Sequence, residues 1–301
     1  MFRDLAGSML KQILPRFFTK AFLFVCILIA GFLVIEWMAN RAEGFANFTV
    51  FTRDVRCMSR PSWLASSDKL TTEIIASIQD QLARFPTDNI FSHDLEHTLQ
   101  TNAVSFSPWI ESVSSFQRIF PSRFRLELKL RHPVGLFYWQ NHSYFIDRLG
   151  VVISMVDHLD RGEVTTALPV ITGFGEISHL QEGYPTSNRF LLEGAAVASE
   201  IRGFENIEEL SHIRILEIDV SRFGNGRPDG VTLFTAGNVR ILWGRSARNT
   251  RFRGIDPSPT EKTMYLKETV LKNPGFRGID QITVTFRNAP SSIVPLSTPD
   301  D

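Results

Sequence analysis

Cysteine is scarce in this chain of 301 residues, which contains only Cys26 and Cys57. The two thiols lie in different regions of the sequence and no CxxC pair is present, so we expect neither an intramolecular disulfide nor a disulfide framework. An excess of either charge is also missing, because 32 Lys and Arg residues balance 32 Asp and Glu residues. Binding to nucleic acid leaves a footprint of clustered basic residues. We therefore expect no nucleic-acid partner.

The sequence also lacks the usual motifs of several enzyme classes. The glycine-rich segment GNGRPDG at residues 224–230 matches neither GxxxxGK[ST] nor GxGxxG, and its composition is typical of a turn between two strands. No GxSxG nucleophile motif occurs. These segments therefore carry no catalytic or phosphate-binding motif, and we expect neither a cofactor nor a small-molecule substrate.

One pair of histidines has the spacing of zinc ligands. His93 and His97 lie one helical turn apart, but the zinc-protease motif requires Glu directly after the first His, where this chain has Asp94. Acidic residues are favourable in the first turn of a helix, so we interpret this segment as a helix start that binds no metal. An anchored metallohydrolase built on the two histidines is an alternative, which metal analysis of residues 47–301 would test.

A long apolar run is present near the N-terminus. From Phe17 to Met38 only Thr19, Lys20 and Glu36 interrupt it, and at ~1.5 Å per residue a helix of this length crosses a hydrocarbon core of ~30 Å. We predict a transmembrane helix at residues 17–38, in contact with the lipid bilayer. Because basic residues precede the run, residues 1–16 are predicted to be cytoplasmic and the rest of the chain extracytoplasmic. A cleaved signal peptide is the competing interpretation.

Residues 47–132 are predicted to form a small domain after a linker at residues 39–46. Apolar residues at helical spacing predict helices at about residues 71–84 and 95–103. Strands are predicted at about residues 48–55, 109–117 and 123–131. The last of these alternates apolar and charged residues and ends before Pro133, which cannot donate to a sheet. The resulting order of elements is β-α-α-β-β.

Residues 133–287 are predicted to form a second domain, rich in strands. Asp147 and Gly150 stand at the turn of a hairpin formed by residues 144–153. Ser187 is expected to cap a helix that reaches Ile201, and Ser258 opens a second helix that runs to about Lys272. Strands are expected at residues 213–220, 231–235 and 281–286. Residues 288–301 have three prolines and no periodicity, so we predict a disordered tail.

The fold class predicted from these elements is α+β. It comprises an N-terminal transmembrane helix, a small β-α-α-β-β domain, and a mixed or antiparallel β domain with flanking helices. This order resembles the FtsQ/DivIB family of bacterial cell-division proteins, in which the β-α-α-β-β unit is a POTRA domain. The residues that carry the resemblance are Asn89-Ile90-Phe91, Phe120-Pro121, Arg131-His132-Pro133-Val134, Asp147 with Gly150, Leu168-Pro169 with Gly173, and the segment Val239 to Gly244.

The resemblance implies a non-enzymatic scaffold of the division machinery at the cytoplasmic (inner) membrane. Its partners would be the small membrane proteins FtsB and FtsL, which the family's β domain recruits. The implied binding mode is addition of a strand to the last strand of the β domain, which has no successor in the sequence to pair with. The predicted binding residues are Gln281, Ile282, Thr283, Val284, Thr285 and Phe286.

The carry-over of these binding residues is incomplete. Phe286 matches an aromatic residue of the family, whereas Thr283 and Thr285 stand where the family often has a charged pair. Pairing through the main chain survives such a change, but a salt bridge there does not. The alternative function is a membrane-tethered POTRA module that binds polypeptides in protein export or envelope assembly by the same strand addition. That alternative predicts several POTRA copies or an outer-membrane barrel, and the sequence has one copy and no barrel pattern.

Overall fold

The computed structural model of the chain describes residues 22–38, 41, 52–59, 107–120, 123–154, 168–224, 230–249, 256–276, 278–285 and 292–295, together with helical residues 72, 75–76, 79–80, 96–97 and 100–101. The chain divides into two compact units. The first comprises Met1–Val55, Arg84–Leu99 and Ser115–Leu126, and the second comprises Arg56–Ala83, Gln100–Ser114 and Glu127–Asp301. The domain boundaries expected from the sequence, at residues 47–132 and 133–287, stay predictions.

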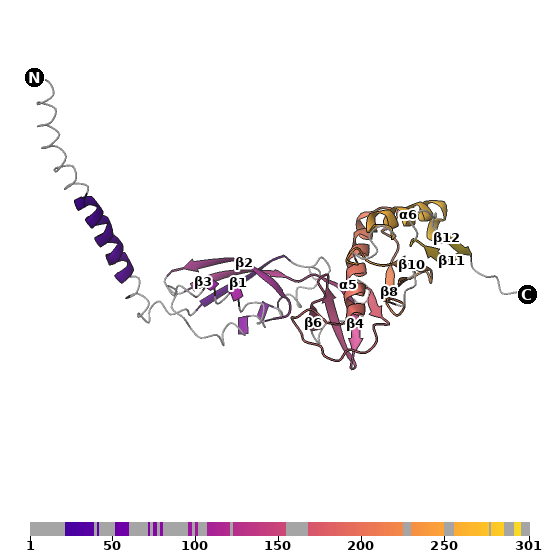
Figure 1. The fold of residues 1–301 in the computed structure, drawn as a ribbon, viewed down its shortest axis with the longest axis horizontal. Coiled ribbons are helices and arrows are strands. Elements are labelled where there is room, and N and C mark those ends of the chain that lie inside the picture. The colour runs from indigo at the N-terminus through magenta and orange to yellow at the C-terminus, as the bar shows by residue number, and fades with distance from the viewer. Residues whose placement is uncertain are drawn as a thin grey trace, which may run out of the picture. The chain divides into compact units, whose positions relative to one another are not determined.

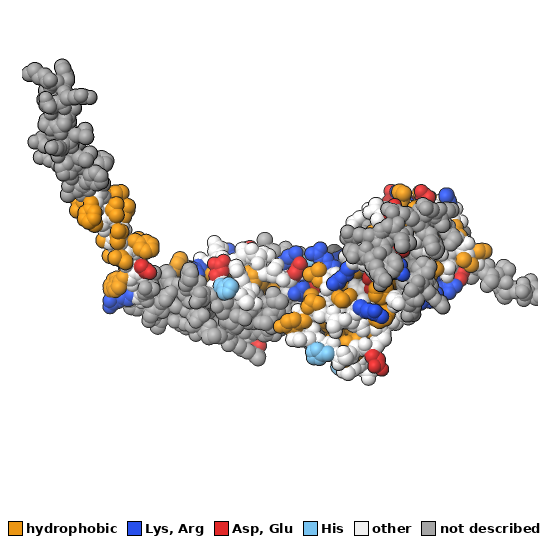
Figure 2. Space-filling model, viewed as in Figure 1, with side chains coloured by type: hydrophobic (Ala, Val, Ile, Leu, Met, Phe, Trp, Pro, Cys, Tyr) orange, Lys and Arg blue, Asp and Glu red, His pale blue; other side chains and the backbone are white. Residues whose placement is uncertain are grey.

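The predicted fold class is wrong in its first element. Residues 22–38 are helical and their side chains are exposed, as the apolar surface of this segment in Figure 2 shows. The predicted start at Phe17 lies outside the described residues, which begin at Phe22. Within the described part of the chain, no helix is both long enough and apolar enough to cross a membrane. The helices predicted at residues 71–84 and 95–103 lie mostly outside the described residues.

The described part of the chain is mostly β-sheet (Figure 1). A three-stranded sheet has the order β1-β3-β2 and consists of β1 (Thr52–Ser59), β2 (Ile110–Ile119) and β3 (Arg123–Leu130). The alternation expected in β3 is confirmed, because its apolar residues from Phe124 to Leu130 are buried while Arg123 is exposed. Pro133 stands just after this strand and opens β4.

A nine-stranded mixed sheet forms the rest, in the order β12-β11-β10-β9-β8-β7-β4-β5-β6. The pairs β4 with β7, β7 with β8, and β10 with β11 are parallel, and the other neighbours are antiparallel. Its strands are β4 (Pro133–Trp139), β5 (His142–Asp147), β6 (Val152–Ser154), β7 (Val170–Thr172), β8 (Ile215–Asp219), β9 (Val231–Thr235), β10 (Arg240–Gly244), β11 (Ile279–Thr283) and β12 (Ser292–Pro295). The predicted hairpin at Asp147 and Gly150 is confirmed as β5 and β6.

Two α-helices accompany this sheet. α5 (Arg189–Ile201) is capped by Asn188, whose side chain accepts hydrogen bonds from the backbone N–H groups of Phe190 and Leu191, and not by Ser187 as the sequence suggested. Both residues are good caps, and the geometry places the cap one position later. The capping box predicted for α6 (Pro259–Lys272) is confirmed between Ser258 and Glu261. Short 3-10 helices, η3 (Arg202–Asn206) and η5 (Pro274–Phe276), follow α5 and α6.

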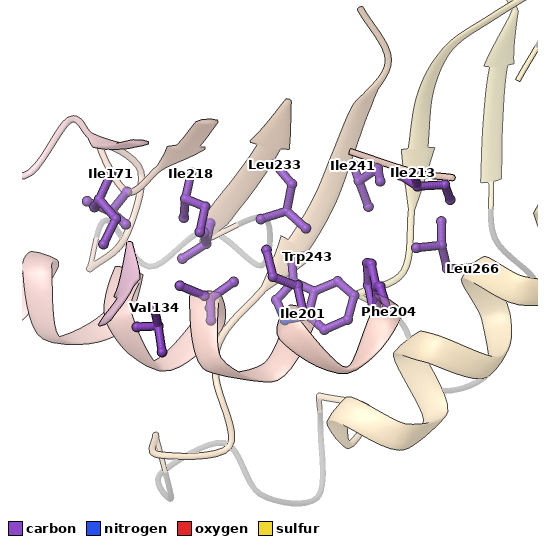
Figure 3. Close-up of a cluster of buried hydrophobic side chains, with 14 of the residues drawn as sticks. Val134, Ile171, Ile201, Phe204, Ile213, Ile218, Leu233, Ile241, Trp243 and Leu266 are labelled. Carbon is purple, nitrogen blue, oxygen red and sulfur yellow. The ribbon is translucent and has the colours of Figure 1, made fainter. Parts of the chain in front are cut away.

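The main core lies between α5 and the sheet. In Figure 3, apolar residues of successive strands point toward the helix, and Trp243 of β10 lies beside Ile201 and Phe204. Gly194 allows a close approach of α5 to the sheet, because a Cβ atom there would lie 2.6 Å from Cγ2 of Ile171. The residues of this core that come from consecutive strands are Ile171, Ile218, Leu233 and Ile241.

Candidate functional site

The predicted binding strand is not a free edge. β11 lies between β10, to which it is parallel, and β12, to which it is antiparallel. β12 (Ser292–Pro295) comes from the tail that was predicted to be disordered. The prediction of disorder is therefore wrong for these four residues, and the prediction that the last strand is a free edge is wrong for β11. A strand of this length, flanked by prolines, has too few residues to show a period of two in the sequence. The end of the nine-stranded sheet is therefore closed by the chain's own C-terminal segment.

The hydrogen bonds of β11 show which residues face each neighbour. The N–H of Val284 donates to the carbonyl of Leu242 at 3.2 Å, so the even-numbered residues direct their backbone groups toward β10. Successive residues of a strand point in opposite directions. The N–H and C=O groups of Gln281 and Thr283 therefore face β12, where they lie opposite Val294 and Ser292.

The same alternation shows which backbone groups of β12 face outward. Ile293 lies opposite Ile282, whose backbone groups face β10, so the N–H and C=O of Ile293 point away from β11. Pro295 has no N–H to donate. Within Ser292–Pro295, β12 therefore presents one outward N–H together with the carbonyl of Ile293. By comparison, Gln281 and Thr283 of β11 present two N–H and two C=O groups to the strand that pairs with them.

The side chains of the predicted site divide into buried and exposed groups. Ile282, Thr283, Val284 and Thr285 are buried, and Gln281 is half-buried. Phe286, which matches an aromatic residue of the family, lies outside the described residues. β12 is much less buried, because Ile293 is 39% exposed and Val294 is 45% exposed. The side chains of β12 are thus less buried than those of the strand with which it pairs.

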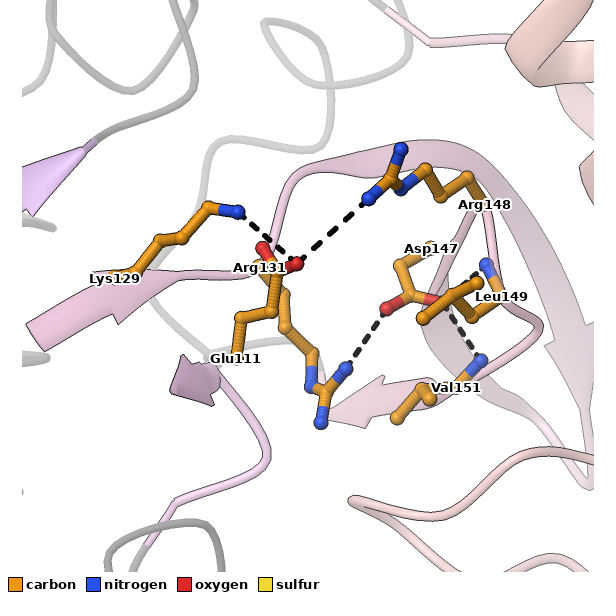
Figure 4. Close-up of polar contacts among 7 residues, drawn as sticks. All are labelled: Glu111, Lys129, Arg131, Asp147, Arg148, Leu149 and Val151. Atoms are coloured by element: carbon orange, nitrogen blue, oxygen red, sulfur yellow. Dashed lines mark hydrogen bonds and ion pairs between the residues drawn. The ribbon is translucent and has the colours of Figure 1, made fainter. Parts of the chain in front are cut away.

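A polar cluster centred on Arg131 and Asp147 lies where β3 leads into the nine-stranded sheet (Figure 4). Nη1 of Arg131 donates to Oδ2 of Asp147 at 3.0 Å, and both side chains are buried. Oδ1 of Asp147 accepts from the N–H groups of Leu149 and Val151, each at 2.8 Å. The Asp of the predicted hairpin therefore fixes both the turn and the orientation of the arginine that ends β3. The sequence pointed to each residue but did not pair them.

Another polar cluster, which the sequence did not predict, consists of Glu200, Trp243 and Lys262 and links α5, β10 and α6. Lys262 is fully buried, donates to the carbonyl of Arg245, and lies over the ring of Trp243 with Nζ 5.4 Å from its centroid. Glu200 accepts from Nε1 of Trp243 at 2.9 Å and from the N–H of Ala247 at 2.6 Å. Burial raises the pKa of Glu200 and lowers that of Lys262. These contacts fix the segment after β10 between the two helices.

Replacing Lys262 by methionine is expected to change how stability depends on pH. The folded-state pKa of Lys262 lies below its unfolded value of 10.5, mainly because of burial, so its stabilising contribution is present above that value and is lost as pH falls through the folded-state pKa. The wild type should therefore gain stability relative to Lys262→Met as pH rises toward 10. Urea unfolding of both proteins at several pH values measures the difference, and a constant difference would contradict the expectation.

The two histidines of the alternative zinc site are only partly described. His97 is helical, whereas His93 lies outside the described residues, so neither the predicted helix start nor the alternative is tested. In the described ranges, no group of three or more His, Cys, Asp or Glu residues is placed to hold a metal ion.

Comparison with known proteins gives this chain no family assignment. The scan against protein-family models and the search of curated proteins both found no match. The resemblance to the FtsQ/DivIB family therefore rests on the residues quoted above.

Proposed function

We propose that this protein is a non-enzymatic scaffold that binds a partner polypeptide by strand exchange, in which a strand of the partner replaces β12 beside β11. The observation that carries the proposal is the mismatch at this edge. β11 presents the backbone groups of Gln281 and Thr283 on a well-packed strand, while its occupant has only four residues and half-exposed apolar side chains. Removing such an occupant costs little buried area.

Replacement is favoured over addition to the outer side of β12. An added strand gains its affinity from main-chain hydrogen bonds, and within Ser292–Pro295 the outer side offers one donor, the N–H of Ile293, beside the carbonyl of that residue. The edge of β11 offers both donors and acceptors at Gln281 and Thr283. In strand exchange the binding strand is still β11, as predicted from the sequence, but β12 has to leave its edge before a partner can bind.

The proposed partners are small division proteins of the FtsB and FtsL type, as the family resemblance implies. A scaffold of this kind would act outside the cytoplasm, at the cell envelope. Fractionation of cells that produce the full chain tests this location, and recovery in the cytoplasmic fraction would argue against division partners.

Removal of residues 289–301 is expected to tighten binding of the extracytoplasmic part of an FtsB-like protein from the same organism by about tenfold. The tail competes for the edge of β11, and a site that is mostly occupied has an apparent affinity reduced by the fraction left open. Isothermal titration of the full and shortened chains measures the change, after thermal melting has shown that the shortened chain is folded. Lost binding would show that β12 is itself the docking strand.

Two proline variants of the full chain separate the two modes further. Val294→Pro removes the donor that faces Gln281 and should strengthen partner binding by loosening β12. Ile293→Pro removes the outward donor and leaves the groups facing β11 in place, so binding should not weaken. Ile293→Ala is the control for the lost side chain. Binding that is lost in Ile293→Pro and kept in Ile293→Ala would contradict strand exchange.

A further inference from the structure

A pocket of about 290 Å³ lies at the polar cluster of Arg131 and Asp147, and all its lining residues belong to the second compact unit. It is lined by Glu111, Lys129, His132, Asp147 and Arg148. In Figure 4, Lys129 of β3 and Arg148 of the hairpin turn reach from opposite sides toward the carboxylate of Glu111. The shape of this cluster is therefore set by two cationic side chains that converge on one carboxylate.

The bonds around this carboxylate are long and solvent-exposed. Oε1 of Glu111 lies 3.2 Å from Nζ of Lys129 and 3.9 Å from Nη2 of Arg148, and the side chains of Lys129 and Arg148 are 41% and 64% exposed. Pairs of this kind contribute little to stability, so the cost of opening them is small. Each cation can therefore turn toward another carboxylate.

The local charge is positive overall. Arg131 and Asp147 form a buried pair whose charges cancel. Lys129, Arg148 and Arg202 carry three positive charges, and Glu111 carries one negative charge. The net charge of these four side chains is therefore +2. This excess is felt at His132, whose pKa is lowered first by burial and then by Arg202, with Lys129 and Arg148 acting in the same direction and Glu111 opposing them. Burial and the surrounding positive charge therefore favour the neutral form of the imidazole.

We infer that this pocket is a binding site for an acidic side chain of a partner polypeptide, which takes the place of Glu111 between Lys129 and Arg148. The carboxylate of Glu111 shows that the two cations accept this chemical group, and the excess positive charge favours binding of an acidic ligand. His132 takes up a proton when an added carboxylate offsets the surrounding positive charge. The site is separate from the edge of β11 and does not depend on strand exchange.

The test uses the full chain and fluorescently labelled hexaglutamate, with hexaglutamine as the uncharged probe. Anisotropy at low ionic strength should show hexaglutamate binding that hexaglutamine lacks. The double variant Lys129→Gln, Arg148→Gln should weaken it on the order of tenfold. The matched control, Arg248→Gln with Lys272→Gln, changes the net charge equally at residues that do not line the pocket and should have little effect. Equal losses in both double variants would overturn the proposal.

Two single variants distinguish a binding site from a structural ion cluster. Glu111→Gln removes the competing carboxylate and should tighten hexaglutamate binding about threefold, whereas weaker or unchanged binding would contradict the inference. Wild-type affinity should rise as pH falls from 7.5 to 5.5, a range in which glutamate with a pKa of about 4.3 stays ionised. His132→Gln should flatten that dependence, with Glu111, Lys129, Asp147, Arg148 and Arg202 unchanged around it. Competition by inorganic phosphate as strong as by hexaglutamate would overturn the assignment to carboxylates.

Discussion

Replacing Asp147 by alanine is expected to lower the free energy of unfolding by about 3–5 kcal/mol. The carboxylate accepts from Arg131 and from the N–H groups of Leu149 and Val151. Its loss leaves a buried guanidinium without its counter-charge and leaves the donors of the hairpin turn unpaired. Nε of Arg131 is already buried without a hydrogen-bond partner among the described residues, so little in its surroundings compensates.

Chemical denaturation of wild type and Asp147→Ala measures this loss, with Glu268→Ala, an exposed carboxylate on α6, as the control. The control should change stability by less than about 0.5 kcal/mol. The double variant Arg131→Met, Asp147→Leu removes both charges, and we expect it to be more stable than Asp147→Ala. A loss below 1 kcal/mol in Asp147→Ala would show that the pair does not organise this part of the fold.

Trp243→Ala is expected to destabilise the protein by about 3–5 kcal/mol. The indole is fully buried, meets the ring of Phe204 edge to face at 5.8 Å, and donates to Glu200. Truncation leaves a cavity between α5 and β10 and removes the ring beneath the buried Lys262. The cost therefore combines lost packing with two weakened polar contacts.

A matched variant separates these contributions. Trp243→Phe keeps an aromatic ring in the core but removes the N–H donor and part of the side-chain volume. We expect the lost hydrogen bond to lower the free energy of unfolding by about 1 kcal/mol, in addition to the cost of the lost volume. Glu200 keeps its bond from the N–H of Ala247 in that variant. Denaturation curves of the two variants measure the difference, and equal losses would mean that the hydrogen bond, and not the packing, dominates at this position.

The sequence predicted elements whose signals are local. The alternation of β3, the Asp147 and Gly150 turn and the capping box of Ser258 each depend on residues close together in the chain, and each is found. β12 was missed because a four-residue strand carries no readable period and its pairing with β11 is decided by tertiary contacts. A prediction of disorder was the result.

The cluster of Glu200, Trp243 and Lys262 was missed for a different reason. A lysine in a helix is usually exposed, so Lys262 was assigned no role. The signal was nevertheless present, since Lys262 shares a helical stripe with Leu266 and Thr269 at spacings of four and three residues, and all three are buried. Its acceptor, the carbonyl of Arg245, and the neighbouring Glu200 are distant in sequence. Such partners could not be found without the fold.

The most direct test of strand exchange is to lock β12 in place. Gln281→Cys and Val294→Cys lie opposite each other, and facing residues of antiparallel strands have Cα atoms about 5.5 Å apart, within the range of a disulfide. Cys26 and Cys57 would be replaced by serine in this protein. We predict that the oxidised form does not bind the FtsB-like partner and that reduction restores binding. Equal binding by the oxidised and reduced forms would contradict the account.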